Sequence, residues 1–232
     1  MVPAPHQVVA ELARGLFGFP PSSKRSLVFH AWITLSATLA GFVIGSVLGI
    51  GLAVAIVHLR SVEASLMPWI VASQTVPILA VAPIVIVALG SIGLTGLMPK
   101  AMIAAYLCFF PVTVGMVKGL NAPDRALRDL MRTYSASRGQ TLLRLRLPSA
   151  LPYLFASLKI AVAGALVGTI VAELPTGAQA GLGARLLAGS YYGQTVQIWA
   201  ALVCAALVAA LLVQAVGLAE SAAARATGAV RR

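Results

Sequence analysis

Residues 122–148 read APDRALRDLMRTYSASRGQTLLRLRLP and form the one long polar segment of an otherwise strongly apolar chain. The segment holds six arginines, and apolar residues recur among them at helical spacing. Leu127, Leu130, Met131 and Tyr134 are spaced i, i+3, i+4 and i+7, so on a helix they share one face while arginines occupy another. This pattern predicts an amphipathic helix whose apolar face needs a partner.

The boundaries of two short helices are visible in this segment. Asn121, Pro123 and Asp124 are start signals for the first helix. A second helical run, Ser137–Leu147, is expected to stop at Pro148 because proline cannot continue the backbone hydrogen bonding. Connections this long usually have a function, but a basic amphipathic segment can also simply anchor to anionic lipid headgroups. Both interpretations are open on the pattern alone.

The composition indicates an all-α polytopic membrane protein. Of its 232 residues 59% are hydrophobic and 10% charged, whereas a soluble domain carries about 25% charged residues. Apolar runs of about 20 residues are long enough to cross the bilayer. The net charge of +11 is explained by basic residues flanking membrane spans, so no nucleic-acid partner is expected. We predict five spans, at about 27–57, 64–89, 100–118, 149–172 and 196–218.

The chain divides into an N-terminal segment, 1–26, and a transmembrane domain, 27–232, with a connecting loop at 119–148. The N-terminal segment either forms a short surface helix or is loosely ordered. Most basic residues outside the spans fall on the side that holds the loop. The positive-inside rule therefore places the loop and the C-terminus in the cytoplasm and the N-terminus outside.

Glycines recur every fourth residue in span one, at Gly41, Gly45 and Gly49. Such spacing lets two helix backbones approach closely within lipid. We therefore expect span one to pack against another span of the same chain.

Span two contains three prolines, Pro68, Pro77 and Pro83, and the polar pair Gln74 and Thr75. Each interior proline removes a backbone hydrogen bond and bends the helix. A polar side chain inside the membrane is a functional candidate. Alternatively, Gln74 bonds a backbone carbonyl that the prolines leave free.

Several functions are not expected from this sequence. No G-x-x-x-x-G-K-[ST] phosphate loop occurs, so the chain is not expected to bind ATP in that way. We predict no catalytic residue, cofactor or metal site, because the three histidines form no zinc motif. Charged residues are nearly absent from the spans, apart from Lys159 and Glu173 near their ends. The chain is therefore expected to be a passage whose energy comes from a partner, and not an enzyme.

From about residue 27 to its end, the chain resembles the membrane permease subunits of binding-protein-dependent ATP-binding-cassette importers of type I fold. The family's cytoplasmic loop reads Glu-Ala-Ala, three residues, Gly, about nine residues, then apolar-x-apolar-Pro. Here Asp-Leu-Met at 129–131 stands at Glu-Ala-Ala, Ser135 at the glycine, and Leu-Arg-Leu-Pro at 145–148 closes the pattern. If Ser135 is left-handed, a non-glycine residue there costs about 1–2 kcal/mol. Alternatively, Ser135 or Ser137 caps the second helix.

The resemblance implies a bacterial inner-membrane importer that alternates in access. Its partners would be a cytoplasmic ATPase that binds ATP and Mg, a second permease subunit, identical or different, an extracytoplasmic substrate-binding protein, and the bilayer. The connections at 90–99 and 174–195 would form the outer mouth. The residues that would couple to the ATPase are Arg125, Leu127, Arg128, Asp129, Leu130, Met131, Arg132, Tyr134, Ser135, Ala136 and Arg138. The residues on or near the pathway would be Gln74, Thr75, Pro77 and Glu173.

The resemblance also suggests a class of solute. Residues 73–77, 82–83, 172–173 and 181–183 look like the subgroup that handles nitrate, sulfonates, taurine and pyrimidine-type precursors. Two rival functions are a membrane scaffold or assembly protein, and a stand-alone channel or secondary transporter. A polar, broken span two argues against a pure anchor, and transport that survives ATP depletion would favour the second rival.

Overall fold

The structure of the chain is a computed structural model that describes residues 3–174 and 180–226, and every regular element in these ranges is helical. Four helices are long and apolar enough to cross a membrane, and a bent helix pair raises the number to five if it counts as one span. The prediction of an all-α polytopic fold is confirmed. The long helices are α2 (Leu27–His58), α5 (Leu97–Leu120), α8 (Leu147–Ala172) and α10 (Thr195–Ala226).

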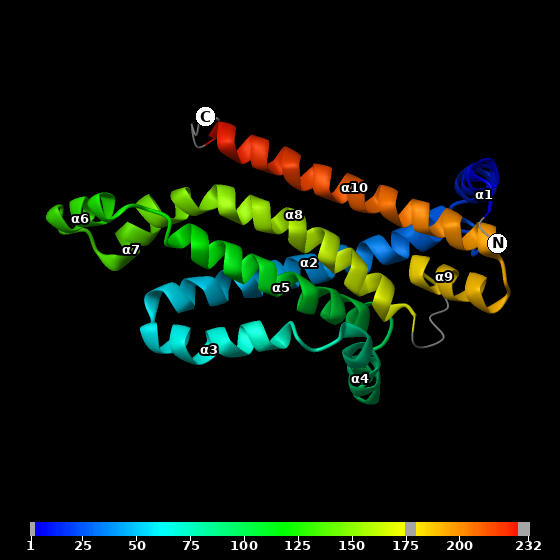
Figure 1. Ribbon diagram of the computed structural model, residues 1–232, viewed down its shortest axis with the longest axis horizontal. Coiled ribbons are helices and arrows are strands. Elements are labelled where there is room, and N and C mark those ends of the chain that lie inside the picture. Colours follow the sequence, from blue (N-terminus) through cyan, green and yellow to red (C-terminus); the bar gives the residue numbers. More distant parts are fainter. Residues whose placement is uncertain (1–2, 175–179, 227–232) are drawn as a thin grey trace.

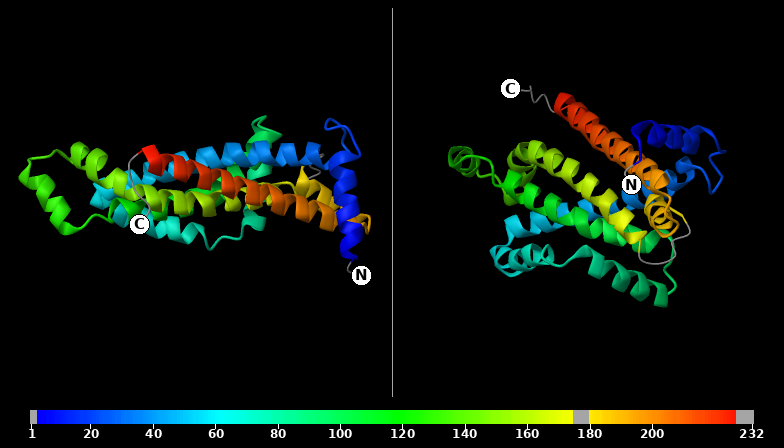
Figure 2. Two further views of the ribbon diagram at one scale, coloured as in Figure 1. Left: turned by 90° about the horizontal axis from the view of Figure 1, so that it is seen from above. Right: turned by 45° about the vertical axis from the view of Figure 1, so that its right-hand side comes forward.

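Shorter helices lie at the two ends of this bundle (Figures 1 and 2). Near the N-terminus, α1 crosses the end of α10, and α6 lies at the opposite end of the molecule. Of the two interpretations of the N-terminal segment, the helix is the one observed. The short elements are α1 (Pro5–Phe17), α6 (Arg125–Thr133), α7 (Arg138–Thr141), the π-helical turn η1 (Leu142–Arg146) and α9 (Leu182–Tyr191).

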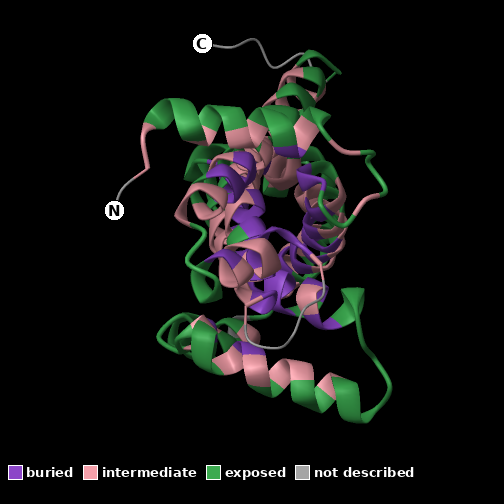
Figure 3. Cartoon of the chain, turned by 90° about the vertical axis from the view of Figure 1, so that its right-hand side faces the viewer, coloured by how far each residue is buried: buried purple, intermediate pink, exposed green. Residues whose placement is uncertain are grey.

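The centre of the bundle is the packing of α2 and α8 on α5, and Figure 3 shows the buried residues gathered there. The three glycines of α2 face α5 in register. A Cβ atom added to Gly45 would lie 2.7 Å from the carbonyl oxygen of Ala105, and one added to Gly41 would lie 2.5 Å from that of Ala101. The prediction that span one packs within the chain is confirmed, because only glycine permits this backbone approach.

The predicted second span is not one helix. It consists of α3 (Arg60–Ser73) and α4 (Ile78–Ser91), which are bent by 102° relative to each other. Pro77 is the residue that precedes α4, so its missing amide falls at a helix start, where it breaks no helical hydrogen bond. The other two prolines lie inside the two helices. One proline of three therefore marks the break.

The prediction that the second loop helix stops at Pro148 is wrong. The helix runs on from α7 through η1 into α8, and Pro148 lies in the first turn of α8. The backbone N–H of Leu147 donates to the carbonyl of Leu142, five residues back. In this π turn the backbone hydrogen bond spans five residues instead of four. The wider turn accommodates the ring of Pro148, so the helix continues past the proline.

The glycine-rich connection at 174–195, expected to form part of the outer mouth, contains a helix. Its second half is α9, which packs against α10 and the ends of α2 and α8. Residues 175–179 of the connection lie outside the described residues.

We predict that Gly45→Ala lowers the thermal unfolding temperature in detergent, because the new methyl group overpacks the α2–α5 contact. The expected loss is about 1–3 kcal/mol. The matched control is Gly51→Ala on the same helix, because a Cβ atom there would meet nothing within 4 Å. Equal unfolding temperatures for the two variants would contradict this account of the core.

Candidate functional site

Helix α6 has one charged half and one apolar half. At 100° per residue, Arg125, Arg128 and Arg132 fall on one half and Leu127 and Leu130 on the other. Because no residue of α6 is buried, tertiary packing within this chain does not cover either half. The predicted amphipathic helix is therefore present.

The apolar half of α6 is open in this chain. Leu127 is 46% exposed, Leu130 50% and Tyr134 76%. Met131 and Ala136 are half-buried. Large exposed apolar side chains grouped on one helix face are typical of a protein-interaction surface. We call the surface formed by Leu127, Leu130, Met131 and Tyr134 the apolar face of α6.

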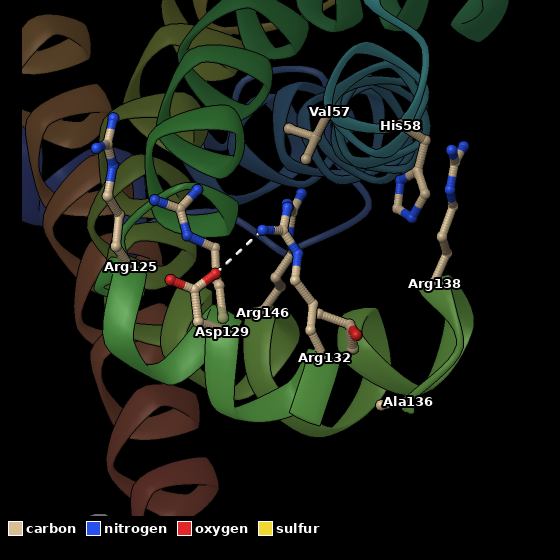
Figure 4. A pocket seen from close by; sticks show the side chains of 10 residues that line it. Val57, His58, Arg125, Asp129, Arg132, Ala136, Arg138 and Arg146 are labelled. Carbon is tan, nitrogen blue, oxygen red and sulfur yellow. Dashed lines mark hydrogen bonds and ion pairs between the residues drawn. The ribbon is translucent and has the colours of Figure 1, made fainter. Parts of the chain in front are cut away.

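The charged half of α6 lines a cavity of roughly 700 Å³ between the loop and the end of α2. In Figure 4, Arg132 and Arg138 extend from the loop toward Val57 and His58 of α2, and Arg125 stands at the far side of the pocket. The structure thus brings the predicted arginines together, but on the opposite side of α6 from the apolar face. The arginines that line this cavity, which we call the arginine pocket, are Arg125, Arg128, Arg132, Arg138 and Arg146.

One carboxylate, that of Asp129, also lines the arginine pocket. It accepts from Nη1 of Arg132 at 3.0 Å, and both side chains are largely exposed. An exposed pair of this kind contributes little to stability, so its role is to orient the Arg132 guanidinium. Arg146 is half-buried, and burial first and the charge of Arg128 second lower its pKa.

The chain reverses at Ser135, which has φ of +50°. The N–H of Ala136 donates to the carbonyl of Met131 at 2.9 Å, and that of Ser135 donates to the carbonyl of Arg132 at 2.8 Å. These two bonds form a Schellman ending of α6, in which the left-handed position is usually glycine. Ser135 therefore ends α6 in the left-handed conformation that glycine usually adopts, although it carries a side chain.

The residue that caps the next helix is Ser137. Its hydroxyl accepts from the N–H of Gln140 at 3.2 Å, and its own N–H donates to Oε1 of Gln140 at 2.9 Å. This reciprocal capping box fixes where α7 begins. The two serines thus have separate roles, one at the end of α6 and one at the start of α7.

Gln74, Thr75 and Pro77 all lie in the break between α3 and α4, and all three are exposed. The side chain of Gln74 donates to the hydroxyl of Ser73 at 3.3 Å. The carbonyl of Ser73 accepts from the N–H of Val76 at 3.4 Å and from the hydroxyl of Tyr106 on α5. Gln74 donates to a neighbouring hydroxyl and not to a backbone carbonyl among the described residues, so the alternative is not observed and the side chain of Gln74 remains exposed.

Glu173 lies one residue beyond α8 and is fully buried. Its carboxylate accepts from Nζ of Lys100 at 3.0 Å, from the hydroxyl of Thr34 at 3.0 Å, and from the N–H of Gly183 at 2.9 Å. Burial raises the pKa of this carboxyl, and the ammonium of Lys100 acts against that rise. Glu173 thereby joins the ends of α2, α5 and α8 to the start of α9.

Two further hydrogen bonds complete this cluster. The N–H of Gly181 donates to Nδ1 of His30 at 3.0 Å, and the N–H of Leu182 donates to Oγ1 of Thr34 at 2.9 Å. Gly181 has φ of +128°, and a Cβ atom there would lie 2.2 Å from the Glu173 carboxylate. Only glycine fits at this position.

Sequence reasoning missed several residues of these sites. The missed residues contact their partners from other helices: Tyr106 contacts Ser73, and Thr34 and Lys100 contact Glu173. In the arginine pocket, the missed residues are His58 and Arg146, which lie outside α6. The one available signal was a polar or charged side chain within or next to an apolar span.

Comparison with known proteins identifies the family. The family described as binding-protein-dependent transport system inner membrane component matches residues 41–225. The chain is 31% identical to a probable ABC transporter permease protein of Haemophilus influenzae, over 81% of this chain and 77% of that protein. It is 34% identical to the formylaminopyrimidine transport permease protein ThiX of Halalkalibacterium halodurans, over 79% and 68%. It is 33% identical to the riboflavin transport system permease protein RibX of Chloroflexus aurantiacus, over 82% and 69%.

The chain therefore belongs to the family of inner-membrane permease components of binding-protein-dependent transport systems. This membership confirms the family resemblance and makes the chain a multi-pass transport subunit. The matched region contains the α3–α4 break, all of α6 and Glu173.

We predict that Glu173→Leu alone destabilises the fold by about 3–5 kcal/mol, because it leaves the charge of Lys100 without its partner. Combining it with Lys100→Met should restore part of that loss, since the unpaired charge is then absent. Unfolding of the two single variants and the double variant in detergent measures this coupling. Strictly additive losses would show that the ion pair does not hold α9.

Proposed function

We propose that this chain is the permease subunit of an ATP-driven importer, in which residues 27–232 form the translocation domain. A cytoplasmic ATPase subunit supplies the energy and binds ATP and Mg, while the permease alternates in access. A second permease subunit, identical or different, completes the pathway, and an extracytoplasmic binding protein delivers the solute. Family membership supports this assembly.

The observation that carries this proposal is the apolar face of α6. Leu127, Leu130 and Tyr134 are exposed at the far end of the bundle, on a helix that this chain does not cover. Such a face fits an apolar groove on a soluble partner. The ATPase would seat Leu127, Leu130, Met131, Tyr134 and Ala136.

Charged side chains on the other half of α6 and in the following turn would fix the register of α6 on the ATPase. Asp129 and Arg132 are paired and largely exposed, with 64% and 83% of their side-chain surfaces open. Arg125 and Arg138 are also exposed. Charges at the rim of an interface act mainly on specificity and association rate. We therefore expect the leucines to matter more for affinity than these charged residues.

The continuous helix from α7 through η1 to α8 is the mechanical element of the proposal. It joins the end of the loop directly to the bundle, and α8 packs on α5 along its length. Movement of the loop when the ATPase closes would therefore tilt α5 and α8 together, as a two-state element biased by a ligand bound elsewhere. The loop and C-terminus would lie in the cytoplasm and the N-terminus outside.

The pathway would run past the α3–α4 break. Gln74, Thr75 and Pro77 are exposed there on a non-helical segment, and such backbone is tolerated at membrane depth only against protein or water. Glu173 would act near the pathway by holding α9 in place. The relatives' names suggest a small solute. We therefore propose a solute of the class that includes nitrate, sulfonates and pyrimidine-type precursors. Two of the relatives are named for the transport of formylaminopyrimidine and of riboflavin.

We predict that Leu130→Asp abolishes co-purification of the partner ATPase, because a buried carboxylate in an apolar groove has no partner. Binding should fall by at least about tenfold. The matched control is Val9→Asp on α1, which is 64% exposed and lies at the other end of the bundle. Unchanged co-purification and ATPase stimulation by the Leu130 variant would refute the docking role.

We also predict that Gln74→Leu reduces solute uptake by reconstituted complexes without changing assembly with the ATPase. The reason is that Gln74 is an exposed polar side chain in the broken segment, whose hydrogen bond to Ser73 is long. Uptake of a radiolabelled panel of sulfonates and heterocyclic precursors measures the effect, and Thr113→Val, which changes a buried hydroxyl of α5, serves as a control. Normal uptake with normal half-saturation would count against the pathway assignment.

A further inference from the structure

The arginine pocket has far more positive than negative charge. Five arginines line it together with His58 of α2, while Asp129 is the one carboxylate in its lining. That carboxylate is already paired with Arg132. Within the described part of the chain, no ion pair neutralises Arg125, Arg128, Arg138 or Arg146. Like charges gathered at one cavity repel one another unless an anion joins them.

The pocket lies on the bundle side of the loop. Its ceiling is Val57 and His58, the last two residues of α2, and Figure 4 shows arginines of the loop pointing toward them. The 32 residues of α2 extend about 48 Å at 1.5 Å per residue, close to the roughly 40–45 Å of a bilayer with its headgroups, so the end of α2 reaches the level of the headgroups. The apolar face of α6, which would meet the ATPase, contributes none of its four residues to the pocket lining.

We infer that the arginine pocket binds the phosphate group of an anionic phospholipid at the cytoplasmic membrane surface. Guanidinium groups bind phosphate oxygens through paired, charge-assisted hydrogen bonds. Basic pockets at the cytoplasmic ends of membrane helices suit anionic headgroups. Arg128 and Arg146 are the half-buried members and hold the phosphate, while Val57 offers an apolar surface to the lipid backbone.

This inference rests on the proposed function only for the cytoplasmic placement of the loop. A bound lipid would neutralise the charged half of α6 and hold it against the end of α2, which leaves the apolar face turned outward. The lipid would thus be a structural ligand that holds α6 in the orientation in which its apolar face can meet the ATPase. The lipid phosphate would be held by Arg128 and Arg146, whereas the ATPase would seat the apolar face of α6, so binding of lipid and binding of the ATPase are measured separately.

The test uses the full chain, purified in mild detergent with equal amounts of phosphatidylglycerol and phosphatidylcholine, and native mass spectrometry to count retained lipid. We expect phosphatidylglycerol to be retained about tenfold over phosphatidylcholine, because the choline cation would face the arginines. Arg146→Gln and Arg128→Gln should each remove most of that preference. The matched control is Arg144→Gln, which changes an exposed arginine two residues from Arg146 that does not line the pocket.

Four results would overturn the inference. The first is an unchanged lipid preference in a correctly folded Arg146→Gln variant, with folding judged by its unfolding temperature. The second is an equal loss of preference in Arg144→Gln, which would mean that loop charge in general attracts lipid. The third is displacement of the lipid by millimolar inorganic phosphate, which would make this a site for the free ion. The fourth is displacement of the lipid on assembly with the ATPase, which would assign the pocket to acidic side chains of that partner.

Discussion

The close backbone contact between α2 and α5 is the constraint on which the rest of the bundle depends. Hydrophobic burial does little to hold two helices together in lipid, so their association relies on close packing. Gly41, Gly45 and Gly49 supply that packing against the small residues of α5. On α8, a Cβ atom added to Gly168 would lie 3.0 Å from the Cα atom of Ala104. The three helices therefore pack closely against one another.

The loop between α5 and α8 is attached to this bundle without a flexible joint. The capping box at Ser137 starts a helix that continues through η1 into α8. The chain reverses between α6 and α7 at the Schellman ending at Ser135. With its charged half toward α2 and its apolar half outward, α6 is inverted relative to an ordinary surface helix. Such an orientation requires a partner on each side, which the ATPase and a lipid phosphate would supply.

The two polar regions of the bundle are satisfied in different ways. At the α3–α4 break, the hydroxyl of Tyr106 and the N–H of Val76 both donate to the carbonyl of Ser73, and Gln74 is exposed. At the other region, Glu173 is fully buried and every contact joins a separate element. The first arrangement leaves the side chains of Gln74 and Thr75 exposed. The second fixes the position of α9, and both follow from the cost of leaving a polar group unpaired away from water.

The sequence by itself determined the membrane class, the positions of the long helices and the two faces of α6, because these depend on local apolar content and on a period of 3.6 residues. It also indicated the glycine contact and a bent second span, but not which of its three prolines marks the break. Only the tertiary structure decided that the helix continues through Pro148 by way of a π turn, that the arginines face α2, and that Glu173 bonds Lys100 and Thr34. The partners of Glu173 lie 73 and 139 residues away along the chain. Contacts at such separations have no local periodicity, so they follow from how the helices pack.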